Sequence, residues 1–181
     1  MNPFTKIFRP ILLLAALQAC ILHASAQGAA PGPANPDSIQ LKNTKGKIVL
    51  YGDLARKNPI VLICFWSVNN ESSIQELTAV AQHIEGWNKM ANFTFLPICV
   101  DDAVLTNRMR PLSNQNGWTF EVFADLTGEL QRLLNFGSVP QSMILQKGQV
   151  VYQQAGYTAG TENYLFNKIL TLSPVKKGPI K

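Results

Sequence analysis

Continuous apolar runs alternate with amphipathic segments along this sequence. The run PIVLICFW at 59–66 has no charged or amide residue, which is typical of a strand covered on both faces. A second run, NFTFLPICVDD at 92–102, predicts another buried strand, although Pro97 cannot donate a hydrogen bond to a neighbouring strand. Between the two runs, apolar residues recur every three or four positions, which predicts a helix with one apolar stripe. The stripe consists of Ile74, Leu77, Val80, Ile84, Trp87 and Met90.

The start of that helix carries two candidate caps. Ser73 and Glu76 have the S-x-x-E spacing of a capping box, in which each side chain bonds to the other residue's backbone N–H group. Asn70 is a second candidate, because its side-chain oxygen can accept from the N–H group three residues later. Either way, polar residues fill the junction between the first buried strand and the helix.

Shorter elements follow in the middle of the chain. Residues 103–117 predict a helix that is broken near Pro111 and ended by Gly117, because proline interrupts helices and glycine ends them. WTFEVFAD at 118–125 predicts a short strand, and GELQRLLNFG at 128–137 predicts a short helix.

Hairpins are expected near both ends of this region. SIQL at 38–41 and KIVLYGDL at 47–54 predict two short strands around a turn. Residues 138–157 predict two more strands, joined at the turn Lys147-Gly148. TENYLFNKILTL predicts a closing helix, capped by Thr161.

The order of these elements indicates an α/β domain over residues 38–172. Strands that alternate with helices indicate a parallel core, and the last hairpin adds an antiparallel edge. The expected architecture is a central mixed sheet with helices on both faces and an N-terminal strand extension.

Residues 1–26 have the features of a secretory signal peptide. Lys6 and Arg9 precede an apolar run at 11–22, which is shorter than the roughly 20 residues that span a bilayer. The small-x-small sequence ASA then offers a cleavage site before Gln27. We therefore expect a secreted or periplasmic protein.

Two other interpretations of this N-terminus stay open. The apolar run would be a membrane anchor if it were not cleaved. Alternatively, LQAC is a lipobox with a lipidated Cys20, although Gln18 stands where a small residue is usual. A membrane is expected as a partner only if Cys20 is lipidated. Residues 27–37 are rich in Pro, Gly and Ala and predict a linker.

Composition adds little about partners. Cleavage lowers the net charge from +5 to +3, with 14 basic against 11 acidic residues. Much of the excess positive charge lies in the tail at 173–181, at Lys176, Lys177 and Lys181. No basic stripe interleaved with aromatic residues accompanies it, so no nucleic-acid partner is expected. His83 is the only histidine after the signal peptide, and no ligand cluster has metal-binding spacing, so we expect no metal and no cofactor.

The sequence FWSVNNESSIQELTAV at 65–80 resembles FWATWCPPCRAEMPAL, a stretch typical of exported thiol–disulfide reductases (TlpA/ResA type) of the thioredoxin-like superfamily. The two lie over each other without a gap. Phe65 and Trp66 match, and Glu76 falls on the glutamate just after the CxxC motif. The resemblance covers roughly residues 37–172 and implies a thioredoxin-like fold.

A second stretch supports the same resemblance. FGSVPQSMIL at 136–145 is similar to the family segment G-I/V-P-T-T-F-L-I, whose proline is cis and faces the CxxC motif. Pro140 takes the place of that proline, and KGQVV at 147–151 matches the hairpin that follows.

The CxxC motif itself is degenerate: Asn70, Glu71, Ser72 and Ser73 occupy its four positions. Thiol–disulfide exchange needs an attacking thiolate and a second thiol that resolves the mixed disulfide. A helix N-terminus lowers the pKa of a thiol, but it does not make an amide or an unassisted hydroxyl into a nucleophile. We therefore expect no catalytic residue at this junction.

The resemblance leaves a binding role open. In the related proteins, the strand-end Trp, the helix start and the cis-proline loop bound a groove that receives an extended peptide by backbone pairing. For this chain, the resemblance implies a non-catalytic binding or accessory module that holds a peptide or an envelope protein. The groove residues would be Trp66, Asn70, Glu76, Val139 and Pro140. In the alternative interpretation the polar residues only begin the helix, and Trp66 belongs to the core.

Cys64 and Cys99 are the remaining thiols after the signal peptide. Each lies in a predicted buried strand, where free cysteine is a common core residue. The alternative is an active redoxin, a thiol–disulfide oxidoreductase or thiol peroxidase, that uses one or both, because strand alternation allows them to face the same side. Burial would raise their pKa and block access, which favours inert thiols.

Overall fold

The computed structural model describes residues 35–173. The predicted signal peptide with Cys20, residues 27–34 of the predicted linker, and all but the first residue of the predicted tail lie outside the described residues. Pro36–Ser38 form a 3-10 helix, η1, so the end of the predicted linker has regular structure.

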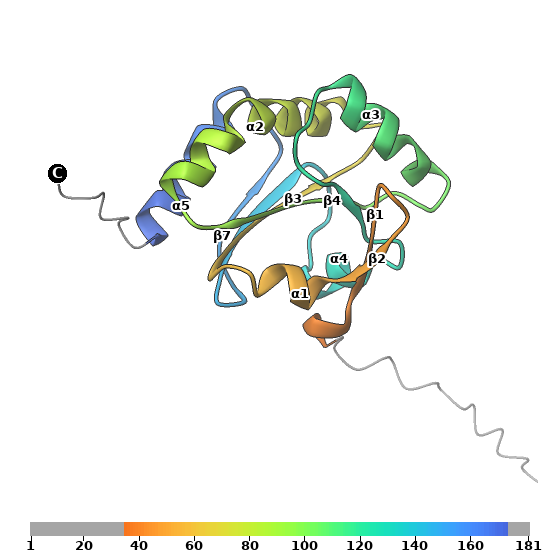
Figure 1. Ribbon diagram of the computed structural model, residues 1–181, viewed down its shortest axis with the longest axis horizontal. Coiled ribbons are helices and arrows are strands. Elements are labelled where there is room, and N and C mark those ends of the chain that lie inside the picture. Colours follow the sequence, from red (N-terminus) through yellow and green to blue (C-terminus); the bar gives the residue numbers. More distant parts are fainter. Residues whose placement is uncertain (1–34, 174–181) are drawn as a thin grey trace, which may run out of the picture. The chain divides into compact units, whose positions relative to one another are not determined.

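A seven-stranded mixed sheet runs through the described domain in the order β2-β1-β5-β4-β3-β6-β7 (Figure 1). The central strand, β3, pairs in parallel with β4 and antiparallel with β6. The strands are β1 (Gln40–Asn43), β2 (Ile48–Leu50), β3 (Ile60–Trp66), β4 (Thr94–Cys99), β5 (Phe123–Ala124), β6 (Gln141–Gln146) and β7 (Gln149–Ala155).

Helices cover both faces of this sheet, as the sequence predicts (Figure 1). On one face lie α2 (Glu71–Met90), α3 (Met109–Gln115) and α5 (Thr161–Leu172), and on the other lie α1 (Tyr51–Ala55) and α4 (Glu129–Leu134). All seven residues of β3 are buried, because successive side chains enter the two cores in turn. Leu62, Cys64 and Trp66 pack beneath α2, and Ile63 and Phe65 pack beneath α1 and α4.

The N-terminal strand extension differs from its prediction in one element. The expected strand at 47–54 ends at Leu50, and the chain then forms helix α1. Tyr51 and Leu54 are both buried in the core beneath α1. Their spacing of three residues places them on one side of a helical turn, and this packing outweighs the β propensity of the local sequence.

Proline does not break α3. A short 3-10 helix, η2 (Leu105–Arg108), precedes α3, so Pro111 lies in the first turn, where a missing N–H group removes no helical hydrogen bond. In β4, Pro97 lies opposite Cys64, and β5 pairs with β4 only from Ile98 onward. Proline therefore fits both elements.

Two helix ends also differ from prediction. Helix α4 ends at Leu134, before residue 137, because Asn135 has a φ of 47° and occupies the left-handed cap position. Thr161 is the first residue of α5, whose cap is Gly160, and the Thr161 hydroxyl accepts from the Thr158 N–H group instead. The turn between β6 and β7 is as predicted, with positive φ at Lys147 and Gly148.

Candidate functional site

Asn70 links the start of α2 to the loop before β6. Its Oδ1 accepts from the Ser73 N–H group at 2.9 Å, so Asn70 is the helix cap. Its Nδ2 donates to the Val139 carbonyl at 3.1 Å, and the Val139–Pro140 peptide bond is cis. One amide side chain thus satisfies a backbone group in its own helix and another that lies 69 residues after Asn70 in sequence.

The capping box predicted for Ser73 and Glu76 is wrong. Because α2 begins at Glu71, Ser73 lies inside the first turn and cannot be the residue before the helix. The Ser73 side chain is buried, and its hydroxyl has no hydrogen-bond partner among the described residues. Glu76 points into the protein and contacts β6 instead.

Glu76 belongs to a buried polar cluster beneath the helix start. Ser142 Oγ donates to Glu76 Oε1 at 2.6 Å and lies 3.0 Å from Cys64 Sγ. Burial raises the pKa of Glu76 to about 7, and the charge of Glu162 adds to this effect, whereas the Ser142 hydrogen bond opposes it. Burial also raises the pKa of Cys64, and the neighbouring Glu76 carboxylate raises it further.

Cys99 has a different partner at the end of β4. Its thiol donates to Asp101 Oδ2 at 3.1 Å, and the Val68 N–H group and the Ser67 hydroxyl donate to the same carboxylate, each at 2.7 Å. Asp101 therefore fixes the chain between β3 and α2. Burial is the main cause that raises the pKa of the Cys99 thiol, which stays protonated at neutral pH.

The two thiols face the same side of the sheet but do not form a pair. Cys64 lies opposite Pro97, and Cys99 lies opposite Trp66, so the two cysteines are diagonal neighbours displaced by two residues. Strand spacing and rise place their Cα atoms about 8 Å apart, beyond the roughly 7 Å that a disulfide can bridge. Both cysteines are free and fully buried.

Burial also corrects the predicted groove. Trp66 has no exposed surface and packs edge-on against Trp118, with ring centroids 5.3 Å apart. Glu76 and Pro140 are buried as well. Of the predicted groove residues, Trp66, Glu76 and Pro140 are therefore part of the buried core, which decides the open question about Trp66, and only Asn70 and Val139 have partly exposed side chains.

The accessible part of the predicted site is polar. Asn70, Ser72 and Val139 are half-buried, and Glu71 is exposed. Asn69 is exposed just before the helix, and its side-chain oxygen accepts from Arg108 Nη1 at 2.6 Å. The surface at the start of α2 therefore offers amides, a hydroxyl and a carboxylate, and no thiol.

Three residues at this site escape prediction from sequence. Ser142 follows Gln141 at the polar start of β6, and nothing in the local sequence distinguishes its buried hydroxyl from an exposed one. Asp101 lies near the end of the predicted strand at 92–102 and just beyond the observed end of β4, where its carboxylate meets the chain after β3. Arg108 gives no local signal either, because only the folded chain brings it to Asn69.

Within residues 35–173, no cluster of three or more His, Cys, Asp or Glu side chains is arranged to hold a metal ion. Over the same residues, no helix has both the length and the apolar character needed to cross a bilayer.

Comparison with solved structures identifies the fold. An uncharacterized thioredoxin-like protein from Porphyromonas gingivalis is 28% identical, covers 75% of this chain and 90% of its own, and superposes with a TM-score of 0.64. A bacterioferritin comigratory protein from Xanthomonas campestris, studied for alkyl peroxide reduction, is 18% identical. It covers 78% of this chain and 96% of its own, with a TM-score of 0.64.

A secreted disulfide oxidoreductase from Mycobacterium tuberculosis is 14% identical, with coverages of 73% and 94% and a TM-score of 0.60. No protein-family model matches the sequence, and no curated protein matches it. The structural similarity nevertheless spans nearly the full length of these thioredoxin-like and redox proteins. The described chain therefore has a thioredoxin-like α/β fold.

Proposed function

We propose that this chain is an exported thioredoxin-like protein of the TlpA/ResA type that has lost its CxxC motif and works as a non-catalytic binding module. The observation that carries this proposal is the chemistry at the start of α2. Asn70 and Ser73 stand where the resemblance places the two redox cysteines, and Asn70 is fully engaged as a cap and as a donor to Val139.

The remaining thiols do not replace the missing pair. Both Cys64 and Cys99 are buried, and both have a raised pKa, so neither supplies an accessible thiolate at neutral pH. Exchange with a protein disulfide requires the attacking sulfur to reach its target in line. A buried, protonated thiol meets neither condition.

The proposed binding surface is smaller than the groove expected from sequence. It consists of Asn69, Asn70 and Val139, with Ser138 exposed beside them. The Val139 carbonyl already accepts from Asn70 and retains one lone pair, so an extended peptide that pairs here has to share this acceptor. The expected occupant is an extended peptide or a segment of an envelope protein.

An insulin-reduction assay with dithiothreitol tests the loss of catalysis. We expect the wild-type protein to give only the uncatalysed rate. The double variant Asn70→Cys/Ser73→Cys is expected to reduce insulin measurably, because Asn70 caps α2 beside the cis-proline loop and Ser73 lies in the first turn.

A matched control carries the same two thiols one residue earlier, as Asn69→Cys/Ser72→Cys, and is expected to remain inactive. Robust turnover by the wild-type protein would contradict the proposal and would favour a redoxin that uses Cys64 or Cys99.

Export is proposed from the N-terminal sequence, and the secreted oxidoreductase with the same fold is consistent with it. Mass spectrometry of the protein purified from its own cells tests this proposal. A mature N-terminus at Gln27 supports a cleaved signal peptide, whereas a diacylated Cys20 indicates a lipid-anchored protein.

A further inference from the structure

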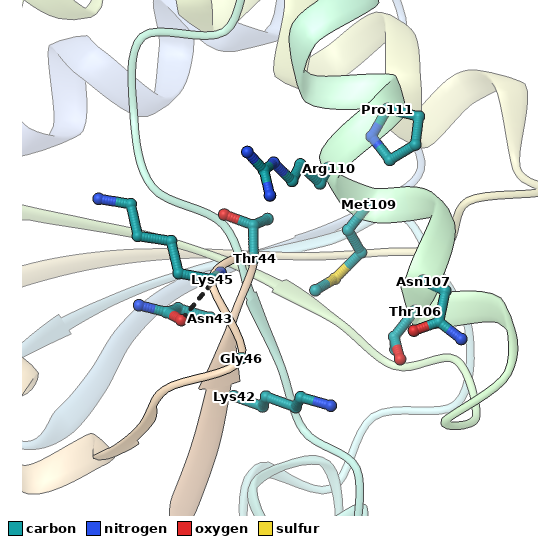
Figure 2. Close-up of a pocket in the computed structure, with 10 residues that line it drawn as sticks. All are labelled: Lys42, Asn43, Thr44, Lys45, Gly46, Thr106, Asn107, Met109, Arg110 and Pro111. Carbon is teal, nitrogen blue, oxygen red and sulfur yellow. Dashed lines mark hydrogen bonds between the residues drawn. The ribbon is translucent and has the colours of Figure 1, made fainter.

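Three basic side chains line a cavity that lies outside the site described above. The cavity has a volume of about 450 Å³ and lies between the turn after β1 and helix α3 (Figure 2). Lys42 and Lys45 come from the hairpin side, and Arg110 comes from α3 (Figure 2). Cavities that bind small molecules commonly have volumes of this order.

The inner wall of this cavity is built from fixed, buried residues. Asn43, Thr106 and Met109 are buried and line it. Asn43 Oδ1 accepts from the backbone N–H groups of Lys45 and Lys47 at 3.0 and 2.8 Å, which holds the turn (Figure 2 shows the first of these bonds). Lys45 is therefore carried by a turn whose backbone is held in place, and Lys42 by strand β1.

The three charges have no ion-pair partner among residues 35–173. Two carboxylates near this region are bound by neutral donors. Glu121 accepts from Asn43 Nδ2 at 2.6 Å, and Asp102 accepts from two backbone N–H groups at the start of η2. An anion in the cavity is therefore attracted by three positive charges that no carboxylate of the described residues neutralises.

We propose that this cavity binds a small organic polyanion, whose phosphoryl or carboxylate groups contact Lys42, Lys45 and Arg110. The guanidinium of Arg110 offers paired N–H donors that match a phosphate or carboxylate, and the lysines add mobile point charges. The Thr44 hydroxyl also lines the cavity and adds a neutral donor.

The lining favours a small molecule over a nucleic acid. No aromatic side chain lines the cavity, so it offers no stacking surface for the bases of a single strand. The basic residues also surround a concave space and do not form an extended stripe. The inference goes beyond the proposed function and does not depend on it, because binding is measured without any redox reaction.

Isothermal titration calorimetry of the purified protein with pyrophosphate and with citrate, at low salt, tests this site. We expect saturable binding of at least one anion, and at least a tenfold weaker affinity for Lys42→Gln/Lys45→Gln/Arg110→Gln. The control variant Lys57→Gln/Lys147→Gln/Arg132→Gln removes the same number of charges away from the lining and is expected to change the affinity less than twofold.

Amide chemical shifts provide a measurement that does not depend on the variants folding. Titration of the wild-type protein with pyrophosphate or citrate is expected to move the signals of residues 43–47 and 106–110 more than those of the rest of the domain. The absence of saturable binding, or an equal loss of affinity in both triple variants, would overturn the proposal.

A flotation experiment with phosphatidylglycerol vesicles, with phosphatidylcholine vesicles as a control, distinguishes the source of the anion. Binding of pyrophosphate or citrate without flotation supports a free small molecule. If the protein binds a soluble anion and also floats with the vesicles, and Lys42→Gln/Lys45→Gln/Arg110→Gln loses both kinds of binding, a phosphate headgroup at the same cavity is supported. Flotation without binding of either soluble anion would refute the proposal in favour of a membrane surface.

Discussion

Glu76 is expected to make the stability of this protein fall as the pH rises. Its pKa is about 7 in the folded state, against 4.5 for an unperturbed carboxyl group, because the side chain is buried and faces the charge of Glu162. Between these two pH values the folded protein retains a proton that the unfolded chain releases. The favourable contribution of the protonated group is therefore complete below about pH 4.5 and is lost as the pH rises through 7.

The magnitude follows from the two pKa values. Each unit of difference corresponds to about 1.4 kcal/mol, so between pH 5 and pH 8 this group alone lowers the free energy of unfolding by about 2.5 kcal/mol. The substitution Glu76→Gln removes the titration. It keeps an oxygen that can accept from Ser142 Oγ, and its amide occupies the position of Oε2, which has no partner within the described domain.

Urea unfolding of wild-type protein and Glu76→Gln at pH 5, 6, 7 and 8 measures this effect. We expect the variant to gain about 2.5 kcal/mol relative to wild type over this range, and to become the more stable of the two at pH 8. Glu85→Gln is the control, since Glu85 is exposed on the same helix, and its curve should run parallel to that of wild type. Parallel curves for Glu76→Gln would refute the buried, proton-linked carboxyl.

Two further substitutions test the backbone groups that side chains satisfy. Asn70→Ala removes both the cap of α2 and the bond to Val139 and is expected to lower the free energy of unfolding by about 1–2 kcal/mol. Asn70→Asp keeps the cap and should cost less. Equal losses in the two variants would contradict a side chain that both caps α2 and donates to Val139. Asp125 is buried, and its carboxylate accepts from the N–H groups at the start of α4. Asp125→Ala should therefore lower the free energy of unfolding by about 2 kcal/mol, and Asp125→Asn by less. A loss below about 0.5 kcal/mol for the alanine variant would contradict this capping role. Both pairs are measured by urea unfolding at pH 7.

Elements with strong periodicity were predictable from the sequence. The unbroken apolar run became β3, which is buried on both faces, and the stripe of apolar residues became α2. Only the last position of that stripe, Met90, is largely exposed, because it lies at the end of the helix. The turn at Lys147-Gly148 was predictable because glycine readily supplies a positive φ.

Elements decided by contacts distant in sequence were not predictable in the same way. Helix α1 forms because Tyr51 and Leu54 find a hydrophobic core that the local sequence does not reveal. The sequence offered two caps for α2, and the choice of Asn70 depends on the Val139 carbonyl, which only the folded chain brings into reach.

The candidate site shows the same division. The sequence placed Asn70 at the helix start, but it left open whether Trp66 belongs to the core or to a groove. The answer depends on Trp118, which packs against Trp66 from a segment about 50 residues later. Glu76 likewise matched a local capping pattern, and its real partner is Ser142 on the neighbouring strand.

Between residues 35 and 173, this thioredoxin-like domain presents no reactive thiol at its surface. Labelling of the native protein with a maleimide at pH 7.5, followed by peptide mass spectrometry, tests it at each cysteine separately. We expect Cys64 and Cys99 to remain unlabelled until denaturant is added, and both then to react. Rapid labelling of either residue in the folded protein would contradict the claim.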